Sequence, residues 1–173
     1  MRHYFIIIAL VFATTVAHGE GDLLDAETRR QIHQVSKIWF KGQRSGLTKQ
    51  EIKQLSPFLS PTAKFPVRIR AARALACAID LQLVLPILRG FLKDEREHEA
   101  TDGGVFLLAV CKSLEDLQDT KALPLIRKWK KVVDTSPRFS EMRDTLPEAL
   151  SNVIKTLQKK QHEQKDAAET ADP

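Results

Sequence analysis

The sequence predicts an all-α protein in which short helices follow one another as antiparallel pairs. No segment shows the sustained two-residue alternation and β-branched enrichment of a strand. Apolar residues instead recur at the three- and four-residue spacing of amphipathic helices, with capping residues at their starts. The segment LPILR at residues 85–89 also recurs as LPLIR at residues 123–127, 38 residues later, which indicates a repeated unit.

The first 19 residues have the three parts of a cleavable secretory signal peptide. Arg2 gives a positive start, residues 4–17 form an apolar run interrupted by two threonines, and AHG at residues 17–19 offers a small-residue cleavage site. The run of 14 residues is shorter than the roughly 20 that span a bilayer, which disfavours an uncleaved anchor. We therefore expect a periplasmic or secreted protein without stable membrane insertion after cleavage.

The remainder is long enough to form one domain with its own core. The chain carries 27 Lys and Arg against 22 Asp and Glu, a net charge of +5 with both signs interspersed. This balance allows contact with an acidic partner and does not demand nucleic acid, which export also disfavours. We expect a single helical domain over residues 20–160 and a disordered polar tail over residues 161–173.

The first two helices are expected over residues 23–41 and directly after Thr48. Asp22 is positioned to cap the first helix. Thr48 and Glu51 have the spacing of a capping box at the start of the second. Pro57 should kink or shorten that second helix, because proline cannot donate the backbone hydrogen bond that the helix interior requires.

The middle of the chain predicts helices over residues 67–79 and 83–94. The first is rich in alanine, which lets neighbouring helices approach closely. Pro86 fits the first turn of the second, which places its regular part at residues 85–94. The acidic run at residues 94–102 lacks the spacing and the glycine of a calcium-binding loop, so we interpret it as solvated charge.

The last third is expected to hold three helices. Trp129 lies on the apolar stripe of the second of them, so we expect it in the core. Because basic residues flank it, stacking on nucleic acid or a lipid headgroup is the alternative. The three helices and their capping residues are 103–117 after Asp102, 120–133 after Asp119, and 145–160 with Thr145 and Glu148 as a capping box.

Three segments resemble HEAT repeats and, more loosely, the related armadillo-like families. VRIRAARALACAI (67–79) looks like the second helix of a HEAT unit, whereas LVLPILRGFLKDE (83–95) and KALPLIRKWKKVVD (121–134) look like first helices. The resemblance covers about residues 48–160. It implies a short right-handed α-solenoid of about three helix pairs with an N-terminal capping helix. A compact orthogonal helical bundle is the alternative.

Second helices of HEAT-like units usually line the concave face of the solenoid. The resemblance therefore points to Arg70, Arg73 and Lys112 as contacts for a protein partner with an acidic surface. Internal ion pairs are the competing interpretation of the arginines. Cys77 and Cys111 fall in different helices, and packed helix axes lie about 8–10 Å apart, so we expect free thiols more than a disulfide between them.

The sequence predicts no catalytic residue, metal site or cofactor. The three histidines after residue 19 stand on separate elements, and no P-loop or nucleophile motif occurs. We expect an exported, non-enzymatic protein-binding module. A periplasmic inhibitor or immunity protein against a toxin or hydrolase is an alternative in the same class, and an enzyme with dispersed carboxylates is the alternative from another class.

Overall fold

Helices and their connecting loops make up the part of the chain that the structure describes. The computed structural model describes residues 24–94 and 103–170, and no strand occurs within these ranges. The predicted all-α class is therefore confirmed. The helices are α2 (Ala26–Ser45), α3 (Lys49–Leu59), α4 (Phe65–Leu75), α5 (Leu81–Lys93), α6 (Gly103–Asp116), the 3₁₀-helix η2 (Thr120–Ala122), α7 (Leu123–Thr135), the 3₁₀-helix η3 (Pro137–Met142) and α8 (Leu146–Thr170).

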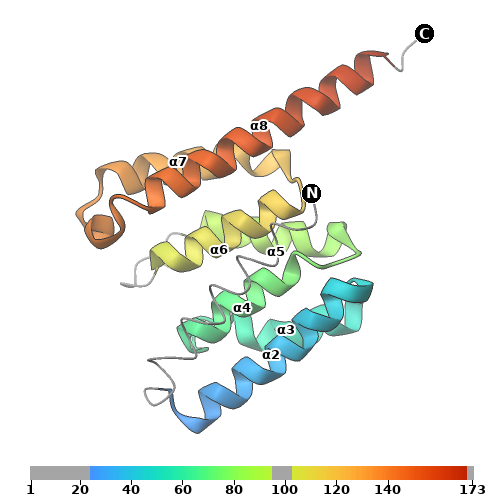
Figure 1. Ribbon diagram of the computed structural model, residues 1–173, viewed down its shortest axis with the longest axis vertical. Coiled ribbons are helices and arrows are strands. Elements are labelled where there is room, and N and C mark those ends of the chain that lie inside the picture. The colour runs from blue at the N-terminus through green and yellow to red at the C-terminus, as the bar shows by residue number, and fades with distance from the viewer. Residues whose placement is uncertain (1–23, 95–102, 171–173) are drawn as a thin grey trace.

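The helices form two rows that follow the order of the chain (Figure 1). In the front row α2 packs on α4, α4 on α6, and α6 on α8, and these four helices run in the same direction. Behind them α3, α5 and α7 run the opposite way and pack on α4, α6 and α8, respectively. Because α5 also contacts α7, the core is shared along the stack and is not confined to one helix pair.

α2 starts and ends later than the sequence predicted. Asp25 is its cap: the carboxylate accepts hydrogen bonds from the backbone N–H of Thr28 at 2.8 Å and from the Thr28 hydroxyl at 2.7 Å. The predicted cap, Asp22, lies outside the described residues. The helix ends at Ser45, before Gly46, whose φ of 75° is a left-handed conformation that glycine adopts at little cost.

The predicted capping box at the start of α3 is confirmed. The Thr48 hydroxyl accepts from the backbone N–H of Glu51, and the Glu51 carboxylate accepts from the backbone N–H of Thr48 at 2.8 Å. Lys41 of α2 forms an ion pair with the same carboxylate. Lys41 and then Thr48 lower the pKa of Glu51 from 4.5 to about 2. α3 ends at Leu59, two residues after Pro57.

α4 is shorter than predicted at its C-terminal end. It stops at Leu75, and the residues that follow bond to the α2–α3 loop instead of continuing the helix. The N–H of Leu47 donates to the carbonyl of Cys77 at 2.7 Å, and the N–H of Ile79 donates to the carbonyl of Leu47 at 3.2 Å. This backbone pairing, which helical periodicity does not reveal, ties the α4–α5 junction to the preceding loop.

α5 begins earlier than predicted, at Leu81 and not at residue 83. Asp80 caps it, because its carboxylate accepts from the backbone N–H of Leu83 at 3.2 Å. Pro86 therefore lies inside the helix and not in its first turn. Proline has no N–H, so Pro86 leaves the carbonyl of Gln82, one turn earlier, without its helical hydrogen bond. Both residues are exposed, so water can solvate this carbonyl.

The cap predicted for the helix over residues 120–133 is wrong. Asp119 precedes η2, yet its side chain makes no capping hydrogen bond. It bonds instead to Arg89 of α5, 30 residues earlier. The chain enters α7 through η2, with Pro124 in the first turn. A buried cross-helix ion pair has therefore taken the place of a local cap.

Trp129 lies in the core, as predicted. It is 2 % exposed, and its indole N–H donates to the carbonyl of Leu92 in α5 at 2.8 Å. This bond satisfies the one polar group of a large buried side chain and fixes α7 against α5. The guanidinium of Arg138 lies over the indole ring, 5.6 Å from its centroid.

Both cysteines are free thiols. Cys111 is fully buried in α6, and Cys77 is half-buried just after α4. Burial raises the pKa of both thiols. Because the thiolate is the nucleophilic form, neither side chain is activated for covalent chemistry at neutral pH.

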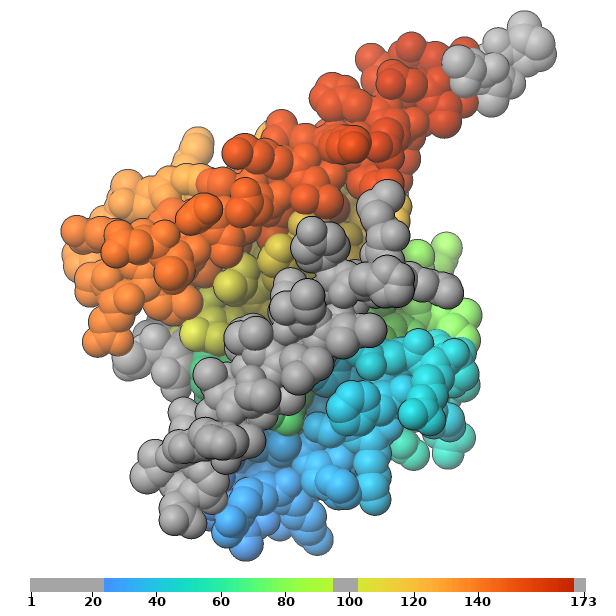
Figure 2. Space-filling view, in the orientation of Figure 1, coloured from blue at the N-terminus to red at the C-terminus, as the bar shows by residue number. Residues whose placement is uncertain are grey.

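α8 continues ten residues beyond the predicted end near residue 160. Its buried stripe ends at Leu157, and residues 161–169 are exposed. Ion pairs within the helix join Lys160 to Glu163 and Lys165 to Glu169. The C-terminal turns project beyond the other helices (Figure 2). Once the apolar stripe has nucleated the helix, polar residues with good helix propensity extend it, so residues 161–170 are helical and not disordered.

Several predicted features lie outside the described residues. They are the signal peptide of residues 1–19, most of the acidic run after Asp94, the cap Asp102 and the last three residues of the tail. Within residues 24–94 and 103–170, no helix combines the length and apolarity needed to cross a bilayer.

Candidate binding groove

The two predicted arginine contacts make internal hydrogen bonds. Arg73 of α4 forms an ion pair of 2.8 Å with Asp116 at the end of α6, and its side chain is 24 % exposed. It also donates to the hydroxyl of Ser113 at 3.5 Å. Arg70 donates to the hydroxyl of Ser36 on α2 at 3.4 Å, and burial lowers the pKa of Arg70. Both arginines therefore bridge α4 to a neighbouring helix.

Lys112, the third predicted contact, lies on α6 and pairs with Glu115 at 2.7 Å. It and Arg73 both lie close enough to Asp116 to lower the pKa of that carboxyl, although burial dominates and raises it overall. The structure thus brings Arg73 and Lys112 together at the end of α6, but two carboxylates accompany them. A role of Arg70, Arg73 and Lys112 in partner binding stays a prediction.

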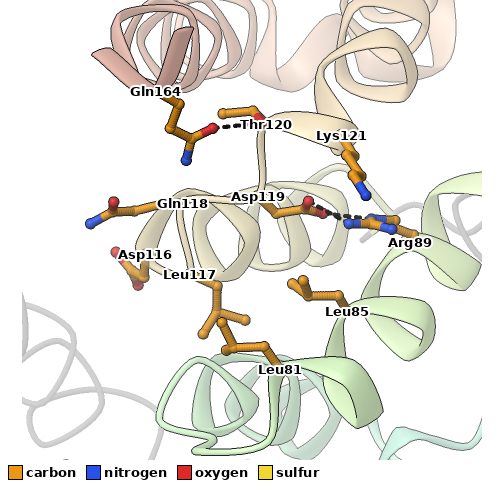
Figure 3. A pocket seen from close by; sticks show the side chains of 10 residues that line it. All are labelled: Leu81, Leu85, Arg89, Asp116, Leu117, Gln118, Asp119, Thr120, Lys121 and Gln164. Carbon is orange, nitrogen blue, oxygen red and sulfur yellow. Dashed lines mark hydrogen bonds and ion pairs between the residues drawn. The ribbon is translucent and has the colours of Figure 1, made fainter. Parts of the chain in front are cut away.

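A surface groove lies where α5, the α6–α7 connection and α8 meet (Figure 3). It has a volume of about 610 Å³, within the usual range of ligand sites. α5 contributes Leu81, Leu85 and Arg89, which are spaced four residues apart and so share one helix face. The other lining residues are Asp116 at the end of α6, Gln164 of α8, and Leu117, Gln118, Asp119, Thr120 and Lys121 of the α6–α7 connection.

The groove has an apolar side and a polar side. Leu81, Leu85 and Leu117 lie together on the apolar side (Figure 3), and Leu81 is 41 % exposed. On the opposite side the Thr120 hydroxyl donates to the side-chain oxygen of Gln164 at 3.3 Å. This hydrogen bond joins η2, just before α7, to the part of α8 that projects beyond the core. The groove therefore offers aliphatic and hydrogen-bonding surfaces within reach of one ligand.

Arg89 and Asp119 form a bidentate ion pair between these two sides. Nε of Arg89 lies 2.6 Å from Oδ2 of Asp119, and Nη2 bonds to Oδ1. The Asp119 side chain is 3 % exposed and that of Arg89 is 24 % exposed. The hydrogen bonds to Asp119 raise the pKa of Arg89. A carboxylate so deeply buried needs this partner, so the pair holds the α6–α7 connection against α5.

A Schellman motif positions Asp119. The N–H of Gln118 donates to the carbonyl of Glu115 at 2.9 Å, and the N–H of Asp119 donates to that of Leu114 at 2.9 Å. Gln118 has a φ of 54°, although glycine is the usual residue at this position. The left-handed residue turns the chain back so that the Asp119 carboxylate faces Arg89.

Lys121 supplies a cation to the groove lining. The side chain is exposed and points toward the Arg89 side of the groove (Figure 3). Within the described residues no carboxylate forms an ion pair with it. Asp116 and Gln118 point away from the Arg89–Asp119 pair. Lys121 is therefore the lining residue best placed to meet a carboxylate of a ligand.

Sequence reasoning did not identify this groove, because its lining comes from three elements separated by up to 83 residues. The signal that was present is Arg89 at the end of the first LPILR segment, three residues after an exposed proline. Within residues 24–94 and 103–170, no group of three or more His, Cys, Asp or Glu side chains is placed to hold a metal ion.

Comparison with known proteins gives no relative: no protein-family model, curated protein or solved structure matches this chain.

Proposed function

We propose that this protein is an exported, non-enzymatic binding module that holds a segment of a partner protein in the groove between α5, the α6–α7 connection and α8. The segment carries an aliphatic side chain beside a carboxylate. The observation that carries the proposal is the juxtaposition, in one groove, of the exposed side chain of Leu81 and the cation of Lys121.

The proposed architecture is a short α-solenoid of three helix pairs, α3–α4, α5–α6 and α7–α8, with α2 as the N-terminal cap. Contacts in chain order and the common direction of α2, α4, α6 and α8 support it. In such a stack each unit contacts its neighbours, and surfaces between units serve as binding sites. The groove lies at such a boundary, between the α5–α6 and α7–α8 pairs.

The lining defines the chemistry of the segment. An aliphatic side chain placed on Leu81, Leu85 and Leu117 removes apolar surface from water, and covering the exposed part of Leu81 alone contributes about 1 kcal/mol. A carboxylate next to it reaches Lys121, whereas Asp119 is already occupied by Arg89. A carboxylate in the segment agrees with the acidic partner predicted from the sequence. The proposed contact, however, is Lys121 in the groove and not Arg70, Arg73 and Lys112 on α4 and α6.

Site-specific photo-cross-linking tests the proposal. A photoreactive phenylalanine replaces Leu81 in one variant and Gln54, exposed on α3, in a matched control. Each variant is expressed from the full sequence, irradiated in intact cells and analysed by mass spectrometry of the adducts. We expect one adduct that forms from position 81 and not from position 54, attached to a segment with aliphatic and acidic residues.

The cross-linked partner is then purified and its affinity measured. Leu81→Glu and Lys121→Glu should each weaken binding about tenfold, or roughly 1.4 kcal/mol, because each removes a favourable contact and adds a carboxylate that repels the one in the segment. Gln54→Glu should leave the affinity within about twofold. Equal adducts from both positions, no adduct from position 81, or an affinity that the groove variants do not change would each contradict the proposal.

A further inference from the structure

Basic residues dominate the exposed side of α7. Arg127 and Lys131 lie one helical turn apart and point away from the apolar stripe that α7 buries. Lys121, in η2 just before α7, is also exposed. In the described part of the chain, no carboxylate forms an ion pair with these three residues, whereas the neighbouring Lys130 pairs with Asp134. The α7 surface therefore carries a local excess of positive charge.

Lys93 extends this surface onto α5. It is exposed at the end of that helix, and the preceding residue, Leu92, accepts the hydrogen bond from the indole of Trp129 that joins α5 to α7. α5 adds no negative charge, since its exposed residues are Leu81, Gln82, Pro86, Gly90 and Lys93. We call Lys93, Lys121, Arg127 and Lys131 the outer basic face.

Internal stability does not explain the whole of this face. Lys93 does interact favourably with the C-terminal end of α5. Arg127 and Lys131, however, are like charges four residues apart on one helix, a spacing at which they repel each other. Their placement disfavours α7 slightly unless an anionic surface compensates it.

We propose that the outer basic face adsorbs the protein to the surface of an anionic lipid bilayer. The face consists of exposed cations on α5, η2 and α7, of which α5 and α7 belong to the rear row (Figure 1). The exposed large apolar side chains of the described residues are Phe40, Ile79 and Leu81, and none of them lies on α7. Protein interfaces centre on apolar or aromatic anchors in fitted pockets, whereas adsorption to anionic headgroups needs cations alone.

This surface shares Lys121 with the groove, but Lys93, Arg127 and Lys131 do not line it, so the inference goes beyond the proposed function. Each cation near an anionic bilayer strengthens binding roughly fivefold, so losing two weakens it about 25-fold. The attraction falls off within a few ångströms at about 0.5 M salt. Adsorption through this face is therefore strongly salt-dependent and leaves the helices outside the bilayer.

Vesicle co-sedimentation tests the proposal. The protein is expressed from the full sequence and purified as the cells process it, with or without residues 1–19. It is mixed with phosphatidylcholine vesicles that contain about one-third phosphatidylglycerol, and with pure phosphatidylcholine vesicles. The variants are Arg127→Gln with Lys131→Gln, and a control of Lys49→Gln with Lys53→Gln, an exposed basic pair of the same spacing on α3.

We expect binding to the anionic vesicles at low salt and about 25-fold weaker binding of the α7 variant, with the α3 control within about threefold of the original protein. Circular dichroism confirms that both variants are folded. Four results would overturn the proposal: no binding to anionic vesicles, equal binding to neutral vesicles, equal losses in both variants, or binding of α7 to an acidic polypeptide in preference to the anionic vesicles.

Discussion

At the scale of single residues, the least typical backbone conformation in the described chain is that of Gln118. The backbone of Gln118 has a φ of 54°, and the Schellman hydrogen bonds donated by residues 118 and 119 hold it there. Left-handed residues other than glycine cost roughly 1 kcal/mol, so the fold tolerates local strain at the point where the groove is built. The benefit is the position of Asp119 against Arg89.

Replacing Gln118 with glycine should stabilise the protein by about 0.5–1 kcal/mol, because glycine adopts the left-handed conformation without a steric penalty. Urea denaturation followed by circular dichroism measures this change. Gln54→Gly, in the exposed interior of α3, is the matched control and should destabilise by about 1 kcal/mol. Destabilisation by both substitutions would show that Gln118 is not strained.

Two helical glycines should respond in opposite directions to alanine. A Cβ atom at Gly42 of α2 would lie 2.6 Å from Cδ2 of Leu47 and 2.9 Å from Cβ of Cys77, so Gly42→Ala should cost about 1–3 kcal/mol through overpacking. A Cβ atom at Gly90 of α5 meets no atom within 4 Å, so Gly90→Ala should stabilise by about 0.5–1 kcal/mol. Thermal and urea unfolding distinguish the two; equal effects would contradict the packing at the end of α2.

At the scale of helices, caps and ion pairs between neighbours set how one element meets the next. Glu51 closes the capping box of α3 and also binds Lys41 of α2, so a single carboxylate orients two helices. Arg89 and Asp119 do the same for α5 and the start of α7. The two pairs differ in the exposure of the basic partner, since the side chain of Lys41 is 67 % exposed and that of Arg89 is 24 % exposed.

The Glu51 site should contribute a measurable acid sensitivity. Its pKa is about 2 in the folded protein and 4.5 ordinarily, so the stability it supplies is complete above pH 4.5 and is lost as the pH falls toward 2. Glu51→Gln should lower the urea midpoint at pH 7 and show a shallower decline between pH 4.5 and 2. Parallel curves for the two proteins across this window would contradict the assignment.

Breaking the Arg89–Asp119 pair should be asymmetric. Arg89→Ala leaves a carboxylate that is 3 % exposed without its partner and should destabilise by about 3 kcal/mol or more. Asp119→Ala leaves a guanidinium that can reach water and should cost less, about 1–2 kcal/mol. Urea unfolding of both single variants and the double variant measures the coupling. Arg127→Ala, an exposed control, should change stability by no more than about 0.5 kcal/mol.

At the scale of the whole molecule, the sequence predicts the helices far better than their boundaries and contacts. Amphipathic periodicity and Thr48–Glu51 identify helices because both signals are local. The local pattern predicts Asp119 as a cap, because its partner, Arg89, is 30 residues away in the sequence. The same pattern predicts Pro86 in a first turn. Its exposure, which makes a proline tolerable inside α5, depends on how the helices pack.

The groove was beyond the reach of sequence reasoning for the same reason. Leu81, Lys121 and Gln164 meet only after α5, η2 and α8 are packed. Arg73 shows the reverse case, since the sequence places it on a helix but cannot reveal that Asp116 forms an ion pair with it. Periodicity therefore predicts what is buried, while the partners of polar residues depend on tertiary contacts.

Hydrogen–deuterium exchange with a destabilising substitution at each end tests the central claim, a stack in which helix pairs contact their neighbours. Gly42→Ala perturbs α2, and Leu157→Ala perturbs the buried end of α8. In a repeat stack, each substitution should reduce protection most at its own end and least at the far end. A uniform loss of protection across all helices, from either substitution, would contradict the stack and indicate a single cooperative bundle.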